Sequence, residues 1–161
     1  MDKDEIKKLI EKHEGRESKV YKDTEGHPTI GVGFNLDRAD ARQKIEALGL
    51  DYDKVRSGEV SLDKGQIDSL RDADVDHAIE AARDNVSNFD GLSDNRQAAL
   101  TDMAFNLGSE GLSKFKNTID AVESGDFEKA AEEMADSQWA GQVGNRSAED
   151  IELMKDDLDE S

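Results

Sequence analysis

The chain has 161 residues, of which 39 are acidic and 21 are basic, so its formal net charge is −18. This length favours one domain, or one domain in two lobes, and can bury roughly 68–70% of the unfolded surface without a disulfide; cysteine is absent. The negative charge excludes a nucleic-acid-binding protein, because affinity for phosphates depends on lysine and arginine.

The first sixty residues predict a small mixed lobe. Apolar side chains at helical spacing, followed by Gly15, predict a helix over residues 4–14. Strand-forming residues on both sides of a polar turn predict a β-hairpin within residues 18–36. Helical spacing returns over residues 38–48, whereas residues 50–60 lack it and predict a connector.

The rest of the chain predicts helices. Ser61 is the expected N-cap of a long helix that ends near residue 86. Residues 94–107 are apolar around most of the helix circumference, so we expect that helix at the centre of a core. Shorter helices are expected at 113–123, 126–136 and 147–155, with Gly125 and a loop at Gly141–Gly144 between them. From residue 149 acids dominate, and we expect a frayed tail.

These elements predict an α+β fold that is mainly α. A small lobe with a hairpin sheet would be joined by a long helix to a larger all-helical lobe. We expect a single two-lobed domain over 1–161, with a mixed lobe at 12–60, a connecting helix at 61–86, a helical lobe at 87–155 packed with 1–11, and an acidic tail at 156–161.

Three residues of the N-terminal region are candidates for chemistry. Glu14 lies at the expected helix end, Asp23 in the turn and Thr29 in a strand. Each has an ordinary alternative explanation, because charges are common on solvated helix ends and aspartate is a routine turn former. Together they can converge on one concave surface. Two carboxylates on separate rigid elements are the minimum equipment for cleaving a glycosidic bond.

The spacing around these residues resembles that of the phage-type lysozymes, the muramidases of glycoside hydrolase family 24. The likeness extends over about residues 5–146, nearly the whole chain. It is carried by Glu14-Gly15, Tyr21-x-Asp23, Thr29-Ile30-Gly31-x-Gly33, Ala99-Leu100, Met103, Phe105, Gly108, Ser137-x-Trp139 and Asn145-Arg146.

The resemblance implies a lysozyme-like fold and hydrolysis of the β-1,4 bond between N-acetylmuramic acid and N-acetylglucosamine in peptidoglycan, by inversion. It implies that Glu14 is the catalytic acid, that Asp23 is its partner carboxylate and that Thr29 positions water. Arg146 would lie against Glu14. The implied substrate contacts are Phe105, Thr118 and Arg146.

The resemblance also implies an endolysin-type enzyme that acts as a monomer on peptidoglycan glycan strands, and it leaves open whether the chain is a free endolysin or a tail domain. Without a signal peptide, such a protein would accumulate in the host cytoplasm before it reaches the wall. No apolar run approaches the roughly 20 residues of a membrane helix, so we expect no membrane insertion. Two alternatives remain, namely a catalytically idle wall-glycan-binding module of a phage structural protein, and an acidic interaction domain.

Some residues depart from the family pattern. Phe34 stands where the family has a histidine, and Asn35 and Glu133 replace a leucine and an asparagine of the cleft. Trp139 could stack on sugar, but a lone tryptophan in a small domain is more often part of the core.

No metal site or cofactor is expected. Asp72-x-Asp74-x-Asp76 lacks the glycine and glutamate of a calcium loop, so we expect three acids on a solvated helix face. His13, His27 and His77 lack the spacing of metal ligands.

Overall fold

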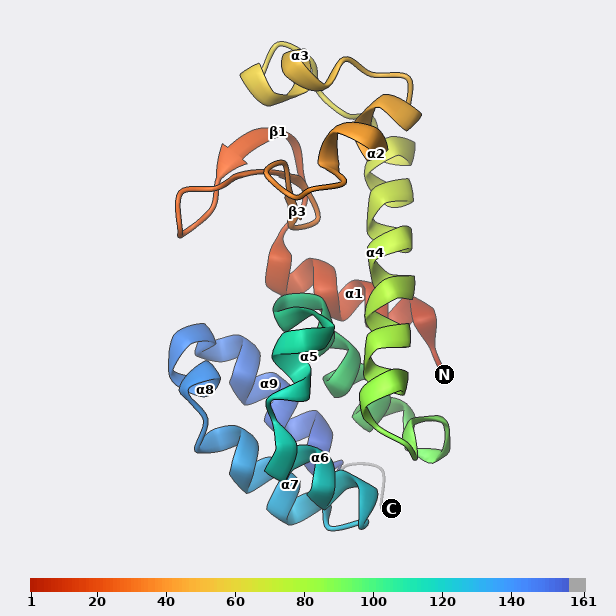
Figure 1. Cartoon of the computed structure of the whole chain (residues 1–161), viewed down its shortest axis with the longest axis vertical. Coiled ribbons are helices and arrows are strands. Elements are labelled where there is room, and N and C mark those ends of the chain that lie inside the picture. The colour runs from red at the N-terminus through yellow and green to blue at the C-terminus, as the bar shows by residue number, and fades with distance from the viewer. Residues whose placement is uncertain (157–161) are drawn as a thin grey trace. The chain divides into compact units, whose positions relative to one another are not determined.

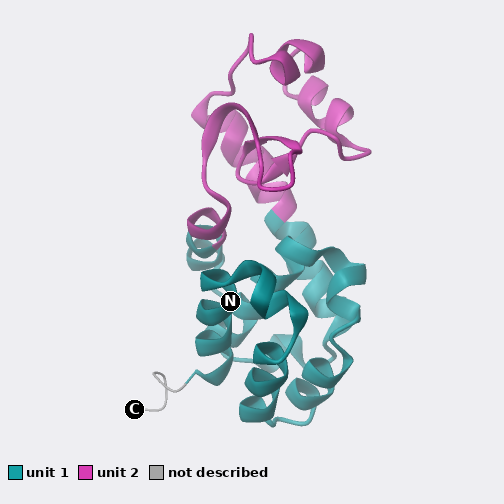
Figure 2. Cartoon of the chain, turned by 90° about the vertical axis from the view of Figure 1, so that its left-hand side faces the viewer, with its two compact units in different colours: residues 1–9, 75–161 teal, residues 10–74 magenta. Residues whose placement is uncertain are grey.

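The computed structural model describes residues 1–156 and shows an α+β fold dominated by helices, as the sequence predicts (Figure 1). The chain forms two compact units (Figure 2). They are Ile10–Asp74, called here the β-containing unit, and Met1–Leu9 with Val75–Ser161, called the helical unit. Their boundaries fall within helices α1 (Lys3–Glu14) and α4 (Lys64–Asn85). Among the described residues, no helix has the length and apolar character needed to cross a membrane.

A three-stranded antiparallel sheet, in the order β1-β2-β3, organises the β-containing unit. The strands are Glu17–Lys22, Pro28–Gly31 and Phe34–Asn35. The first two form the expected hairpin, and β3 extends it by one short strand. Ile30 and Phe34 are almost fully buried and anchor the sheet. Tyr21 lies opposite Thr29 in the register of β1 and β2, so the two side chains share one face of the sheet.

Two short helices follow the sheet, α2 (Ala41–Ala47) and α3 (Tyr52–Ser57). The segment over residues 50–60, expected as a connector without helical spacing, contains helix α3. The side chain of Asp51 accepts a hydrogen bond from the backbone N–H of Lys54, and Gly58 ends α3 in the left-handed conformation with φ 88°. These caps provide hydrogen-bond partners for backbone groups at both ends of α3. The helix is too short for a helical period to be recognised in its sequence.

Helix α4 begins at Lys64, so the prediction of Ser61 as its N-cap is wrong. Asp63 and Gln66 form a reciprocal capping box instead. The Asp63 carboxylate accepts from the N–H of Gln66, and the Gln66 amide oxygen accepts from the N–H of Asp63, both at 2.8 Å. The N–H of Leu62 donates to the carbonyl of Ser18 on β1 at 2.9 Å. This hydrogen bond holds Leu62 against β1, two residues before α4 begins.

The helical unit contains the remaining elements. They are a 3-10 turn at Phe89–Gly91, α5 (Asp94–Ser113), α6 (Lys116–Glu123), α7 (Phe127–Ala135), α8 (Gln138–Val143) and α9 (Asn145–Lys155). The middle of α5 is central to the core, as predicted: Ala99, Leu100 and Met103 have no exposed surface. Gly108 interrupts α5 with a non-helical backbone, at φ 75° and ψ 169°.

Helix α8 replaces most of the predicted loop at Gly141–Gly144. Its N-cap is Ser137, whose hydroxyl accepts a hydrogen bond from the N–H of Ala140. Trp139, in the first turn of α8, is 4% exposed. A capped turn and one large buried side chain therefore stabilise a helix in a region whose two glycines suggested a loop.

The predicted fraying from residue 149 is also wrong as far as residue 156. Helix α9 continues to Lys155, and Met154 on its last turn is fully buried. Arg96 of α5 donates to the backbone carbonyls of Met154 and Lys155, each at 2.8 Å. These bonds satisfy carbonyls that a helix end leaves without partners. The predicted acidic tail at 156–161 begins one residue too early, because Asp156 is 4% exposed and accepts a hydrogen bond from Asn95 at 2.6 Å. Residues 157–161 lie outside the described residues.

Not all of the three acids on α4 are solvated as expected. The carboxylate of Asp74 is only 11% exposed and accepts from Arg38 at 2.7 Å. The guanidinium of Arg38 also lies over the ring of Phe34, 4.3 Å from its centroid. Asp76 is more exposed and pairs with Lys3 at 3.3 Å.

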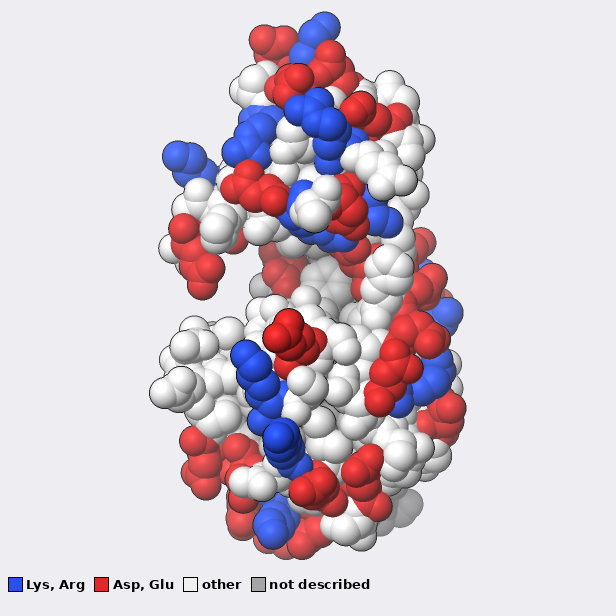
Figure 3. Space-filling model, in the orientation of Figure 1, with Lys and Arg blue, Asp and Glu red and all other residues white. Residues whose placement is uncertain are grey.

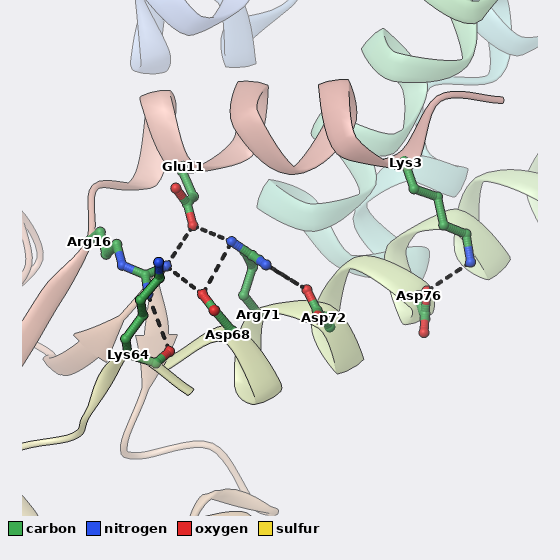
Figure 4. A network of polar contacts seen from close by, with 8 residues as sticks. All are labelled: Lys3, Glu11, Arg16, Lys64, Asp68, Arg71, Asp72 and Asp76. Carbon is green, nitrogen blue, oxygen red and sulfur yellow. Dashed lines mark hydrogen bonds and ion pairs between the residues drawn. The ribbon is translucent and has the colours of Figure 1, made fainter. Parts of the chain in front are cut away.

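A charged network links α1 and α4 within the β-containing unit (Figure 4). One carboxylate oxygen of Glu11 accepts from Arg16 at 2.8 Å and from Arg71 at 2.6 Å. Asp68 also pairs with both arginines, at 2.8 and 3.4 Å. The two acids and two bases alternate, so each charge has an opposite charge as its neighbour.

We expect Glu11→Ala to lower the free energy of unfolding by about 1–3 kcal/mol, because both arginines lose a partly buried charged acceptor. Chemical denaturation would measure the change. Glu17→Ala, which removes an exposed glutamate from β1, is the control and should change stability by no more than about 0.5 kcal/mol. Equal effects of the two substitutions would show that the network contributes nothing.

Candidate functional site

The first candidate residue, Glu14, is the last residue of α1 and is half-buried. Gly15 follows it in the left-handed conformation, with φ 81°, and its N–H donates to the carbonyl of Glu11 at 2.8 Å. A glycine is favoured here because a side chain is strained at positive φ. The helix therefore ends at Glu14 and presents its carboxyl group next to the sheet.

The second candidate, Asp23, directly follows β1 and is fixed by its own loop. One carboxylate oxygen of Asp23 accepts from the backbone N–H groups of Glu25 and His27, both at 2.9 Å. The hydrogen bond from His27 is the main reason that the pKa of Asp23 lies below its ordinary value, and the bond from Glu25 acts in the same direction. Asp23 therefore stays ionised further into the acid range than a free aspartate.

The third candidate, Thr29, lies on β2 and is 3% exposed. Its hydroxyl donates to the backbone carbonyl of His27 at 3.1 Å, and the same carbonyl accepts from the N–H of Asp23 at 2.9 Å. The peptide groups of His27 thus connect Asp23 and Thr29. Since the Thr29 hydrogen is committed to this bond, its oxygen can act as an acceptor for another donor.

Tyr21 connects the two carboxylates electrostatically. Burial raises its pKa, and the negative charges of Glu14, Glu17 and Asp23 raise it further. Both Glu14 and Asp23 therefore lie close enough to the phenol to oppose its ionisation. The sequence motif includes Tyr21, but Tyr21 was not among the residues predicted for the candidate site.

The helical unit carries a pocket of about 500 Å³, and Thr118 is part of its wall. Helices α5 to α8 and the segment between α5 and α6 form the wall. Its lining residues are Leu107, Gly111, Lys114, Phe115, Lys116, Asn117, Thr118, Glu133, Asp136, Ser137, Gln138, Trp139 and Gln142. Aromatic side chains surrounded by charged and amide groups are typical of a site that takes a small polar ligand.

Two aromatic residues organise this pocket. The rings of Phe115 and Trp139 meet edge to face, with centroids 6.0 Å apart. The indole N–H of Trp139 donates to the side-chain oxygen of Asn106 at 2.9 Å. The prediction that Trp139 belongs to the core is confirmed, since it is 4% exposed, and its remaining surface faces the pocket.

Arg146 and Phe105 are not among the residues that line the pocket. Arg146 is 8% exposed and binds Asp102 with two nitrogens, at 2.7 and 3.1 Å from the carboxylate oxygens. Phe105 is half-buried on α5. The expected approach of Arg146 to Glu14 concerns residues of two different units and stays a prediction.

A second buried carboxylate, Asp150, lies near this pair. It has no exposed surface, and neither of its carboxylate oxygens has a hydrogen-bond partner among the described residues when the group is ionised. Burial raises the pKa of Asp150 strongly, and the neighbouring Asp102 carboxylate raises it further, whereas Arg146 opposes the shift. A protonated Asp150 can donate to Asp102, which resolves the missing partner.

The sequence can be compared with known proteins. The phage lysozyme family model matches residues 11–150. "Probable T4-type lysozyme 2" of Dictyostelium discoideum is 30% identical over 150 residues, which cover 88% of each chain. "Probable T4-type lysozyme 1" of the same organism is 27% identical over 158 residues, 93% of each chain. "Pre-baseplate central spike protein Gp5" of Enterobacteria phage T4 is 30% identical over 147 residues, which cover 87% of this chain but 26% of Gp5.

Proposed function

The chain belongs to the phage lysozyme family, and from this premise we propose that it is a muramidase that hydrolyses the β-1,4 bond between N-acetylmuramic acid and N-acetylglucosamine in bacterial peptidoglycan. The observation that carries the proposal is the hairpin. Within one unit, the peptide groups of His27 connect Asp23 to Thr29, and the charges of Glu14 and Asp23 both act on Tyr21.

In the proposed mechanism Glu14 is the general acid. Its carboxyl proton passes to the glycosidic oxygen as the bond between that oxygen and the anomeric carbon breaks. The departing sugar leaves as an alcohol, and Glu14 is left as a carboxylate. Solvent then returns the proton before the next cycle.

Asp23 and Thr29 handle the attacking water. The Thr29 oxygen, whose own hydrogen is committed to the carbonyl of His27, accepts one hydrogen of the water. The ionised Asp23 takes the other as a proton, and the water oxygen bonds to the anomeric carbon. Asp23 then releases this proton to solvent, so both carboxyl groups return to their starting states. The lowered pKa of Asp23 suits this role, because a carboxyl group must be ionised to accept a proton. Attack opposite the leaving group inverts the anomeric centre.

We also propose that the pocket of the helical unit contacts the glycan, with Thr118 and Trp139 in its wall presenting the small surface that their burial leaves, 2% and 4% exposed. Its amide and hydroxyl groups suit sugar hydroxyls, and its aromatic rings suit the apolar face of a pyranose. Phe105 and Arg146 are the other proposed contacts, and they are assigned by the family resemblance alone. The enzyme is proposed to act as a monomer.

The direct test of the function uses purified peptidoglycan. We expect new reducing ends on N-acetylmuramic acid, which borohydride reduction and sugar analysis identify. Proton NMR at early times should show the α-anomer as the first product, as inversion of a β-bond requires. Reducing ends on N-acetylglucosamine would contradict the bond assignment, and a β-anomer would contradict inversion.

A second candidate is a wall-binding module of a phage structural protein. The similarity to the pre-baseplate spike protein Gp5 favours it, since a domain of this kind there forms about a quarter of a longer chain. The first candidate, the muramidase, is favoured by the two T4-type lysozymes, of which this chain matches 88% and 93% of the length. A protein that binds peptidoglycan but releases no reducing ends would support the idle module.

The net charge of −18 leads to a prediction about encounter with the wall. Acidic side chains occur over both units, with basic side chains among them (Figure 3). Bacterial walls are largely anionic, so long-range repulsion should slow the approach until salt screens it, over about 8–10 Å at physiological ionic strength. We expect lysis of whole cells to rise between about 10 and about 150 mM salt.

Soluble wall fragments without anionic polymers serve as the control for this prediction. Their hydrolysis should depend little on salt, because the repulsive partner is absent. A strong fall in whole-cell lysis over the same range would show that attraction, and not repulsion, governs the encounter.

A further inference from the structure

The backbone of Gly33 lies directly beneath the carboxyl group of Glu14. Gly33 connects β2 to β3 at φ 64°. A Cβ atom placed on it would lie 2.7 Å from Oε1 of Glu14 and 2.9 Å from its carboxyl carbon. Both distances are shorter than Cβ atoms make in proteins, so the Glu14 carboxyl occupies the space that a side chain at position 33 would fill.

The neighbouring glycine of the same motif differs in this respect. Gly31 also has φ 64°, but a Cβ there would meet only Cγ2 of Ile67, at an ordinary distance of 3.6 Å. The two glycines therefore share one backbone requirement and the same strain on substitution. They differ in what a methyl group would displace. A methyl group on residue 33 would displace the carboxyl group of Glu14, whereas a methyl group on residue 31 would displace no residue of the candidate site.

Gly33 is rigidly held. Its neighbours Val32 and Phe34 are 2% and 1% exposed, so both sides of the glycine are anchored in the core of the β-containing unit. Glu14, in contrast, is the last residue of a helix, and its side chain has several rotatable bonds. A fixed backbone surface next to its carboxyl group restricts the positions that this group can take.

We propose that Gly33 is a positioning residue for the catalytic acid, because its bare backbone forms the surface against which the Glu14 carboxyl is placed. This inference rests on the proposed function of Glu14. Proton transfer needs the carboxyl within hydrogen-bond reach of the glycosidic oxygen. A displacement of about 1 Å in such a group can lower the rate by about 100-fold.

The test compares Gly33→Ala with Gly31→Ala. Both variants carry the same backbone strain, and unfolding curves establish the folded fraction of each. We expect Gly33→Ala to lower kcat on peptidoglycan fragments by at least about 10-fold, with KM changed by less than about twofold. We expect Gly31→Ala, corrected for its folded fraction, to keep kcat within about twofold.

A readout that does not depend on activity follows the carboxyl group of Glu14 itself. With the glutamate side chains labelled by carbon-13, the Glu14 carboxyl signal should move in Gly33→Ala. In Gly31→Ala it should stay where it is in the unchanged protein. A purely structural role for Gly33 would alter stability without moving the Glu14 signal.

Shortening the acid provides a second test of the same contact. The side chain of aspartate is one methylene shorter, so Glu14→Asp should relieve the contacts at 2.7 and 2.9 Å, while the Cβ of residue 14 would still lie 3.2 Å from the methyl group. If Gly33→Ala does not fold in the native background, we expect it to recover its folded fraction in the Glu14→Asp background, and failure to recover would overturn the proposal. We expect Gly33→Ala to lower kcat by less than about threefold in the Glu14→Asp background, compared with at least about 10-fold in the native background.

The outcomes separate this inference from the function it rests on. Equal kcat values for Gly33→Ala and Gly31→Ala, with unmoved Glu14 signals, would overturn the positioning role while leaving the muramidase assignment intact. Full activity of Glu14→Gln would overturn the assignment of the acid, and a displaced Glu14 signal in Gly33→Ala would then remain as a structural fact alone.

Discussion

Glu14→Gln is expected to lower the rate of peptidoglycan hydrolysis by at least about 100-fold, the usual contribution of a general acid. Glutamine preserves the size of the side chain at the end of α1, but it has no proton to give to the glycosidic oxygen. The loss should appear in kcat, whereas KM should change little, since the interaction arises only in the transition state. Counting reducing ends on purified peptidoglycan measures it.

Glu17→Gln is the matched control for this substitution. Glu17 lies three residues further along on β1, is exposed, and also acts on Tyr21 through its charge. The two variants lose the same charge near the same strand. Full activity in both would contradict the role of Glu14, and a large loss in both would point to the local charge and not to a proton donor.

Asp150→Asn is expected to stabilise the protein at neutral pH by roughly 2–4 kcal/mol. In the unfolded chain Asp150 ionises near pH 4, whereas in the folded helical unit burial and the Asp102 carboxylate keep its pKa raised. Folding at pH 7 must therefore take up a proton. Asparagine is neutral in both states and can still donate from its amide to Asp102.

The sign of the pH dependence follows from the raised pKa of Asp150. Its contribution to stability is fully present below about pH 4 and is lost as pH rises towards the folded-state pKa, by at most about 1.4 kcal/mol for each pH unit. The stability advantage of Asp150→Asn should therefore be near zero at pH 4 and grow through pH 8. Urea unfolding at several pH values measures this difference.

Glu152→Gln, on the same helix, controls for the removal of one negative charge from a chain at −18. Its carboxylate is 72% exposed, so its effect on stability should be small and nearly independent of pH. If Asp150→Asn and Glu152→Gln showed the same dependence on pH, the buried pair would have no special part in folding.

The hairpin was predictable because its chemistry is local. Asp23 and Gly26 are residue types that favour turns for known physical reasons, and the segments on either side of them are rich in strand-forming residues. The helix of Glu14 was predictable from its apolar spacing and Gly15. The short helices α3 and α8 were missed because their stability comes from single caps, Asp51 and Ser137, and not from a periodic pattern.

The buried acids were missed for a different reason. Asp102 and Arg146 are 44 positions apart, so their pairing is a property of the packed helices. One signal was present in the sequence: Arg146, Asp150 and Met154 follow one another at intervals of four residues, and Met154 is buried. Such spacing puts all three on one helix face. The acidic composition from residue 149 onward instead predicted a frayed tail that included Asp150.

The way in which Asp23 is held has a consequence for how freely this hairpin can change. Its two donors are the backbone N–H groups of residues 25 and 27, so any residue type except proline supplies them. Glu25 and His27 can therefore be exchanged for lysine or neutral residues while the carboxylate stays in place. The surface charge of the loop can therefore vary while the main chain keeps the Asp23 carboxylate in position.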